Sequence, residues 1–182
     1  MIVPMTASNK ADFNTANEPF EVIGRLIPKY EGGSWSSAEE LFAYPHEKTY
    51  EPCEARPEDY IGRPDRAVFF FTGPTDSVGD AGCEGQIVLS KNWNGYALIE
   101  DLCVRKASRR SGVGSALFEA GVRWAKSAGL PGLAVETQDN NLAACRFYAK
   151  HGMVIGSVDV MVYDNFPAVA DEKAVYWYMK FA

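Results

Sequence analysis

Cysteine and histidine are scarce in this sequence, and it has neither a long apolar run nor an excess of positive charge. Its 182 residues include four cysteines, with no Cys-x-x-Cys pair, and two histidines, a set too sparse to predict a zinc site, a redox motif or a disulfide framework. No stretch approaches the roughly 20 apolar residues of a membrane span, and residues 1–19 lack the features of a secretory signal. The net charge of −6 excludes a general nucleic-acid binder. We therefore expect a cytoplasmic protein that uses no metal and has neither a nucleic-acid nor a membrane partner.

The composition is that of an ordinary globular chain. Apolar residues make up 47% and charged residues 23% of the sequence, and the length fits one domain. Residues 1–16 are small and polar, which favours a flexible N-terminal arm ahead of a single domain over residues 17–182.

Local patterns predict a mixed α/β fold. Apolar residues at helical spacing over 20–27, ended by Pro28, indicate a first helix, and Ser37 with Glu40 forms a capping-box pattern for a second. Four prolines over 44–66 predict a long surface connection, and the polar stretch 72–85 predicts a turn. We expect further strands at 67–71, 86–89, 96–104, 132–136, 155–163 and 174–181, a tight turn at Asn94-Gly95, and helices at 113–128 and 142–151. Strands alternating with helices suggest one mixed sheet with helices packed on it.

One glycine-containing loop carries a chemical signal. The run Arg109-Arg110-Ser111-Gly112-Val113-Gly114-Ser115 lies between a predicted strand and an amphipathic helix. Glycines let backbone N–H groups approach an anion, and a helix N-terminus presents partial positive charge to it. Lys106 and the two arginines add formal charge. The loop therefore predicts a phosphate or pyrophosphate site, although a tight turn bearing solvated arginines would look the same.

Two motifs together resemble the GNAT superfamily of acyl-CoA N-acyltransferases. The first is Arg109-x-x-Gly112-x-Gly114, and the second is Asn141-x-x-Ala144-x-x-Phe147-Tyr148-x-x-x-Gly152. One departure is Met153, where the superfamily usually has Phe after this glycine. The resemblance covers about residues 96–153. It implies a mostly antiparallel sheet that is splayed at the CoA site and flanked by helices, acetyl-CoA as cosubstrate without a metal, and a homodimer as one expected assembly. The residues implied in binding acetyl-CoA are Leu102, Val104, Arg109, Arg110, Ser111, Gly112, Val113, Gly114, Ser115, Asn141 and Ala144.

The resemblance also implies catalytic groups. An alkyl ammonium with a pKa near 10.4 is almost wholly protonated at neutral pH, so acetyl transfer to an amine needs a proton acceptor. Glu100 is the expected base, acting directly or through water near a β-bulge, and Tyr148 is the expected acid for the departing thiolate. Asp101 would hold the substrate cation or order the same site. A carboxylate bonded to backbone and a core tyrosine are the structural alternatives for these positions.

Three further segments resemble the streptothricin acetyltransferases within this superfamily: residues 17–28, 136–141 and 174–178. This implies acetylation of an amine on the β-lysine part of streptothricin, and so antibiotic resistance. The residues expected to contact this small cationic amine are Asp101, Glu136, Trp35 and Tyr163. A GNAT enzyme for another amine (a polyamine, an amino acid or a protein lysine) and a non-catalytic acyl-CoA-binding module remain alternatives.

Overall fold

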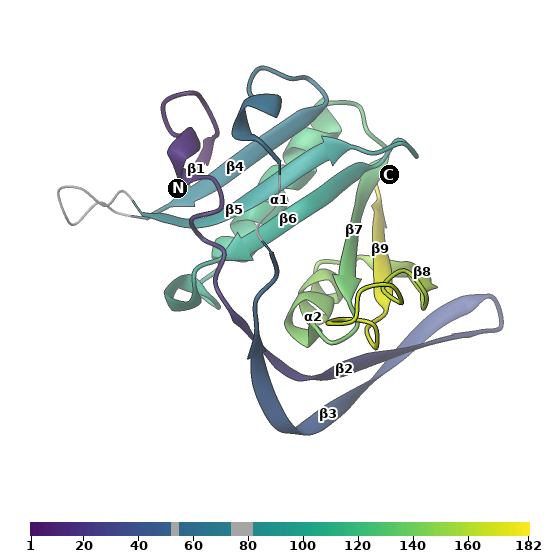
Figure 1. The fold of residues 1–182 in the computed structure, drawn as a ribbon. Helices are drawn as coiled ribbons and strands as arrows, with labels where there is room; N and C mark the ends of the chain where they lie inside the picture. The colour runs from purple at the N-terminus through teal and green to yellow at the C-terminus, as the bar shows by residue number, and fades with distance from the viewer. Residues whose placement is uncertain (52–54, 74–81) are drawn as a thin grey trace. The chain divides into compact units, whose positions relative to one another are not determined.

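The computed structural model describes residues 1–51, 55–73 and 82–182 of the chain (Figure 1). Most of the turn predicted over 72–85, and Cys53, lie outside the described residues. The chain divides into two compact units. The first comprises residues 1–19, 49–133 and 181–182, and the second comprises residues 20–48 and 134–180. In the described residues, no helix is long and apolar enough to span a membrane.

The first unit is built on four antiparallel strands. Their order across the sheet is β1 (Ile2–Pro4), β4 (Arg66–Thr72), β5 (Cys83–Lys91) and β6 (Ala97–Val104). Helix α1 (Val113–Ser127) packs on these strands, and the short 3-10 helices η1 (Lys10–Asp12), η2 (Pro57–Asp59) and η3 (Lys106–Ser108) lie in the connections (Figure 1). The predicted turn between β5 and β6 is confirmed, with Gly95 at a φ of +87°.

Helix α1 and the sheet enclose an apolar core. Leu117 and Ala125 are fully buried on the helix, as are Ile87 and Leu89 on β5. Gly121 lies at a close approach of the helix to the sheet, where a Cβ would lie 3.0 Å from Ile87 Cδ1. This is the stripe that the helical spacing over 113–128 predicts.

The expected N-terminal arm is instead part of the first unit. Ile2–Pro4 pair with β4, Met5 donates its backbone N–H to Val68 O, and Ala16 is fully buried. A few apolar side chains and free backbone groups are enough to hold a short segment when a sheet edge is available beside it.

The second unit contains a long β-hairpin, three strands and a helix. The hairpin consists of β2 (Phe20–Glu31) and β3 (Ser34–Lys48). Strand β9 (Ala174–Lys180) lies between β7 (Gly132–Gln138), whose residues 134–138 belong to this unit, and β8 (Val154–Asp159), which it pairs antiparallel. Helix α2 (Leu142–Lys150) contacts β2. The mixed α/β class with mostly antiparallel strands is therefore confirmed.

The two helices predicted before residue 44 are wrong, because this segment forms the β2–β3 hairpin. Val22, Gly24 and Leu26 are buried while the residues between them are more exposed, which is the two-residue period of a strand. Two glycines with positive φ, at 32 and 33, make the turn. The apparent capping box then lies within β3, where Ser37 pairs with Pro28 and Glu40 with Arg25.

Ion pairs attach the hairpin to the rest of the second unit. The Lys48 ammonium contacts Glu172, and both side chains are largely buried. Arg146 forms a two-pronged hydrogen-bonded pair with Glu39, with the shorter contact at 2.5 Å. These contacts come from residues more than 100 positions apart in the chain, which explains why local periodicity mispredicted the segment.

Candidate functional site

The glycine loop ends in a helix N-terminus that no side chain caps. Gly112 is the N-cap residue of α1, with a φ of +95°, and Arg110 also has a positive φ of +64°. The backbone ladder of the helix begins with the bond from Ala116 N to Gly112 O at 3.0 Å. The backbone N–H groups of residues 113–115, in the first turn of the helix, therefore have no acceptor within the helix. Free N–H groups of this kind can bind phosphate oxygens.

Arg109 holds this loop in place. Its guanidinium donates to the backbone carbonyls of Val104 at 2.9 Å, Pro19 at 2.7 Å and Glu18 at 2.9 Å. The Glu18 carboxylate in turn accepts the Lys106 N–H at 2.5 Å. The charge of Arg109 is thus directed toward carbonyl oxygens that precede β2, whereas Arg110 is exposed beside the helix end.

Glu100 lies at a β-bulge in β6. In the ladder with β5, Val88 pairs with Asp101 and Leu89 with Ile99, so Glu100 is the extra residue. Its exposed carboxylate accepts hydrogen bonds from the hydroxyls of Ser90, at 2.5 Å, and Tyr60. The predicted bulge is confirmed, and it places an exposed, hydrogen-bonded carboxylate directly after the buried Ile99.

Leu102 and Val104 follow this bulge on β6. Leu102 lies opposite Ile87 and Val104 opposite Gly85 in the β5 ladder. The role of their backbone in binding acetyl-CoA stays a prediction.

Asp101 is part of a buried polar network. Its Oδ2 accepts from Gln86 Nε2 at 2.7 Å, and Gln86 also bonds Asn14 through both its amide oxygen and its amide nitrogen. Burial raises the pKa of Asp101, while the hydrogen bond from Gln86 opposes that shift. These contacts favour an ordering role for Asp101 over direct contact with a substrate cation.

Loss of the Gln86 amide should destabilise the first unit. Gln86 is fully buried, so Gln86→Leu would leave Asp101 and Asn14 with unmet hydrogen bonds and lower the free energy of unfolding by about 3 kcal/mol. The variant should also raise the native pKa of Asp101 further. Stability relative to the parent protein then falls as pH rises through that pKa, so the deficit should be larger at pH 8 than at pH 5. Urea unfolding at both pH values measures this, and equal deficits would contradict the proposed link to Asp101.

Helix α2 and its cap carry three predicted residues, of which Asn141 and Ala144 are half-buried and Tyr148 is buried. The Asn141 side chain accepts the Ala144 N–H at 3.1 Å and so caps the helix, as the sequence predicts. Tyr148 is 4% exposed. Burial raises the pKa of the Cys145 thiol to about 11, which disfavours an acyl-enzyme at this cysteine because the thiolate is the nucleophile.

Two of the predicted substrate residues come together in the second unit. The Tyr163 hydroxyl donates to Glu136 Oε1 and accepts from Gln138 Nε2 at 2.8 Å. Trp35 lies at the hairpin turn, where its ring is 5.0 Å from that of Tyr30. Among the residues that the structure describes, no hydrogen bond or ring contact joins Trp35 to Glu136 or Tyr163.

Comparison with models of known protein families identifies the family of this chain. A model described as the acetyltransferase (GNAT) family matches residues 34–153, more than half of the chain. The chain belongs to the GNAT family.

Individual GNAT relatives match the chain along its whole length. Streptothricin acetyltransferase A of Bacillus subtilis (strain 168) is 46% identical over 181 residues, covering 100% of both chains. A crystal structure from Bacillus anthracis, assigned as a streptothricin acetyltransferase and complexed with acetyl coenzyme A, has a TM-score of 0.87 at 35% identity and covers 100% of this chain and 99% of that one. A nourseothricin acetyltransferase shares the fold, with a TM-score of 0.79 at 23% identity over 99% and 97% of the two chains.

Two of the candidate carboxylates have neighbours that sequence reasoning missed. Tyr60 and Ser90 donate hydrogen bonds to Glu100, and Tyr176 lies near enough to Glu136 for that charge to raise its pKa. Ser90 offered a weak signal as a polar residue at the end of an apolar strand. Tyr60 offered none, since it precedes Glu100 by 40 residues in a proline-rich connection.

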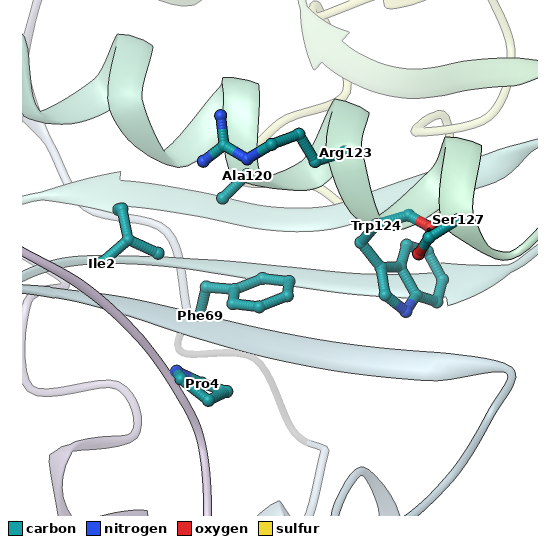
Figure 2. A pocket seen from close by; sticks show the side chains of 7 residues that line it. All are labelled: Ile2, Pro4, Phe69, Ala120, Arg123, Trp124 and Ser127. Atoms are coloured by element: carbon teal, nitrogen blue, oxygen red, sulfur yellow. Dashed lines mark hydrogen bonds between the residues drawn. The ribbon is translucent and has the colours of Figure 1, made fainter.

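The first unit of this GNAT protein also has a pocket with a different lining. Figure 2 shows the Phe69 ring with Ile2 and Pro4 of β1 on one side and α1 on the other. Its remaining lining residues are Ala120, Arg123, Trp124 and Ser127. None of the predicted site residues lines it. In the part of the chain that the structure describes, no group of three His, Cys, Asp or Glu side chains is placed to hold a metal.

Proposed function

We propose that this chain transfers an acetyl group from acetyl-CoA to an amine of the β-lysine part of streptothricin and so gives resistance to that antibiotic. The observation that carries the proposal is the 46% identity to streptothricin acetyltransferase A over the full length of both chains. Acetylation removes one positive charge, which weakens the attraction of a cationic antibiotic to an anionic target.

The residues present fit acetyl-CoA. The uncapped N-terminus of α1 and the glycine with positive φ before it suit the pyrophosphate. Arg110 supplies charge, Arg109 fixes the loop, and Asn141 and Ala144 are proposed to contact the cosubstrate from α2. Acetyl-CoA supplies an activated thioester. The protein must then remove a proton from the acceptor ammonium group and provide one to the departing thiolate.

We assign the proton transfers to Glu100 and Tyr148. Glu100 accepts a proton from the ammonium group, directly or through water, so that the neutral amine can attack. In the described residues its hydrogen-bond partners are two hydroxyls, and no lysine or arginine forms an ion pair with it. Tyr148 donates a proton to the departing thiolate; because a thiol has a pKa near 8.5, this demand is modest. Asp101, Glu136, Trp35 and Tyr163 are proposed to order or contact the acceptor.

The function is tested by release of the CoA thiol from acetyl-CoA. Streptothricin, spermidine and a lysine-containing peptide serve as separate acceptors. Fast release with streptothricin alone supports the proposal. Thiol release with spermidine or the peptide, but not with streptothricin, would show that the enzyme acts on another amine. Tight binding of acetyl-CoA without thiol release from any acceptor would support a non-catalytic module.

Substitution of Gly112 should weaken acetyl-CoA binding. Alanine at a φ of +95° strains the backbone by about 1–2 kcal/mol, and this strain would displace the N–H groups that face the pyrophosphate. Gly112→Ala should therefore raise the KM for acetyl-CoA about tenfold. Gly95→Ala is a matched control, since Gly95 has a φ of +87° and equally open surroundings in a hairpin turn. A similar KM increase in both variants would argue against the loop as the binding site.

A further inference from the structure

Glu136 stands out as an exposed carboxylate on a strand that is otherwise buried. Its neighbours Val135 and Thr137 are 4% exposed. The Trp177 indole donates to Thr137 Oγ1 at 2.9 Å, which ties β7 to β9 at this level. The backbone that carries Glu136 is thus held firmly beside the backbone that carries Tyr176.

One phenol donates to this carboxylate, and a second lies beside it. Tyr163 donates to Glu136 Oε1, and Tyr176, on the neighbouring strand β9, lies near enough for the charge of Glu136 to raise its pKa. Gln138 Nε2 donates to the Tyr163 oxygen at 2.8 Å. Because an amide nitrogen can only donate, this bond directs the Tyr163 proton toward Glu136.

Both phenols remain neutral donors under ordinary conditions. Burial first, and then the charge of Glu136, raises the pKa of Tyr176 to about 12, and burial and Glu136 raise the pKa of Tyr163 as well. In the described residues no lysine or arginine pairs with Glu136. The result is an oriented negative charge that has hydroxyl partners and lacks a cation.

The loop that carries Tyr163 adds apolar surface. The exposed side chains on this loop are Val160, Met161, Val162 and Phe166. Asp159 Oδ1 accepts the N–H groups of Met161 and Val162, at 2.9 and 3.0 Å, which fixes the start of the loop. A carboxylate on the same unit as exposed apolar side chains matches an ammonium group carried on an aliphatic chain.

We propose that Glu136, held by Tyr163 and Tyr176, binds an ammonium group of the acceptor other than the one that is acetylated, and that Tyr176 and Gln138 are positioning residues for it. This proposal rests on the proposed function, since it concerns the acceptor of that reaction. Glu136 contributes through binding, so its loss should alter the KM for the acceptor and leave kcat and the KM for acetyl-CoA unchanged.

Steady-state kinetics of Glu136→Gln and Tyr176→Phe test this assignment. We expect the KM for streptothricin to rise roughly tenfold in Glu136→Gln and about threefold in Tyr176→Phe. Raising the ionic strength should increase the KM of the parent protein and have little effect on Glu136→Gln. Tyr176→Phe should add nothing to KM in the Glu136→Gln background, because the phenol acts through the carboxylate. Tyr44→Phe, at an 88% exposed tyrosine, is the control.

Other outcomes overturn the proposal or redirect its test. An unchanged KM in Glu136→Gln, or a lower kcat at unchanged KM, overturns it, as does an additive effect in the double variant. If the parent protein does not acetylate streptothricin, the proposed function fails on its own. The site is then tested by calorimetric titration with spermidine: weaker binding to Glu136→Gln than to the parent supports it, and equal or absent binding to both overturns it.

Discussion

Glu100→Gln is expected to lower kcat with streptothricin about 1,000-fold, within the range that a general base contributes. Glutamine keeps the size of the side chain and can still bond the hydroxyls of Ser90 and Tyr60, so the bulge in β6 should survive. What is lost is the ability to accept a proton from an ammonium group. Binding of acetyl-CoA should not change. Steady-state release of the CoA thiol measures kcat, and calorimetric titration measures the affinity for acetyl-CoA.

The pH dependence of the Glu100→Gln variant provides a second readout. Below a pKa near 10.4, the fraction of neutral amine rises about tenfold for each pH unit. The rate of Glu100→Gln depends on this fraction more strongly than the rate of the parent protein does. The ratio of the parent kcat to the variant kcat should therefore become smaller between pH 7 and pH 9. Glu119→Gln, at an exposed position on α1, is the matched control. A constant deficit over this range would indicate that Glu100 serves substrate binding or local structure instead.

Tyr148→Phe is expected to lower kcat about 100-fold, at the lower end of general acid contributions. The thiolate is a good leaving group, so it gains less from a proton than an alkoxide would. Tyr148 is 4% exposed on the face of α2 that also buries Leu142 and Cys145. Removal of one oxygen preserves this packing, and the melting temperature should change little.

The measurement that separates chemistry from packing is single-turnover acetyl transfer with acyl donors of different leaving groups. A donor whose leaving group has a lower pKa than CoA should recover part of the rate lost in Tyr148→Phe, since it needs less protonation. Tyr44→Phe on the exposed side of the hairpin should behave as the parent protein does. Equal turnover of Tyr148→Phe and the parent with acetyl-CoA would remove the acid role.

Much of the framework could be predicted from local patterns. The stripe over 113–128 predicts α1, the capping asparagine at 141 predicts the start of α2, and continuous apolar runs predict β4, β5 and β6. These features depend on residues within a few positions of one another, so the signal is complete in a short window. The same holds for the glycine loop, where the residue types required at a helix N-terminus are adjacent in sequence.

The β2–β3 hairpin shows where local patterns fail. Val22 and Leu26 fit a helical spacing and a strand spacing almost equally well over so short a segment. Pairing with β3 and ion pairs such as Lys48 with Glu172 favour the strand. No window of neighbouring residues contains those partners.

The sequence by itself pointed to the GNAT family, because two motifs of short fixed spacing carry the resemblance. That resemblance in turn implied the candidate acid, the candidate base and a phosphate-binding role for the glycine loop. Only the tertiary structure decided what surrounds them. Arg109 holds the loop to a carbonyl 91 residues away, and Glu100 is held by a phenol 40 residues away. Such contacts form only when the folded chain brings distant strands and loops side by side. Neither residue of such a pair has a pattern in its neighbouring sequence that reveals the other.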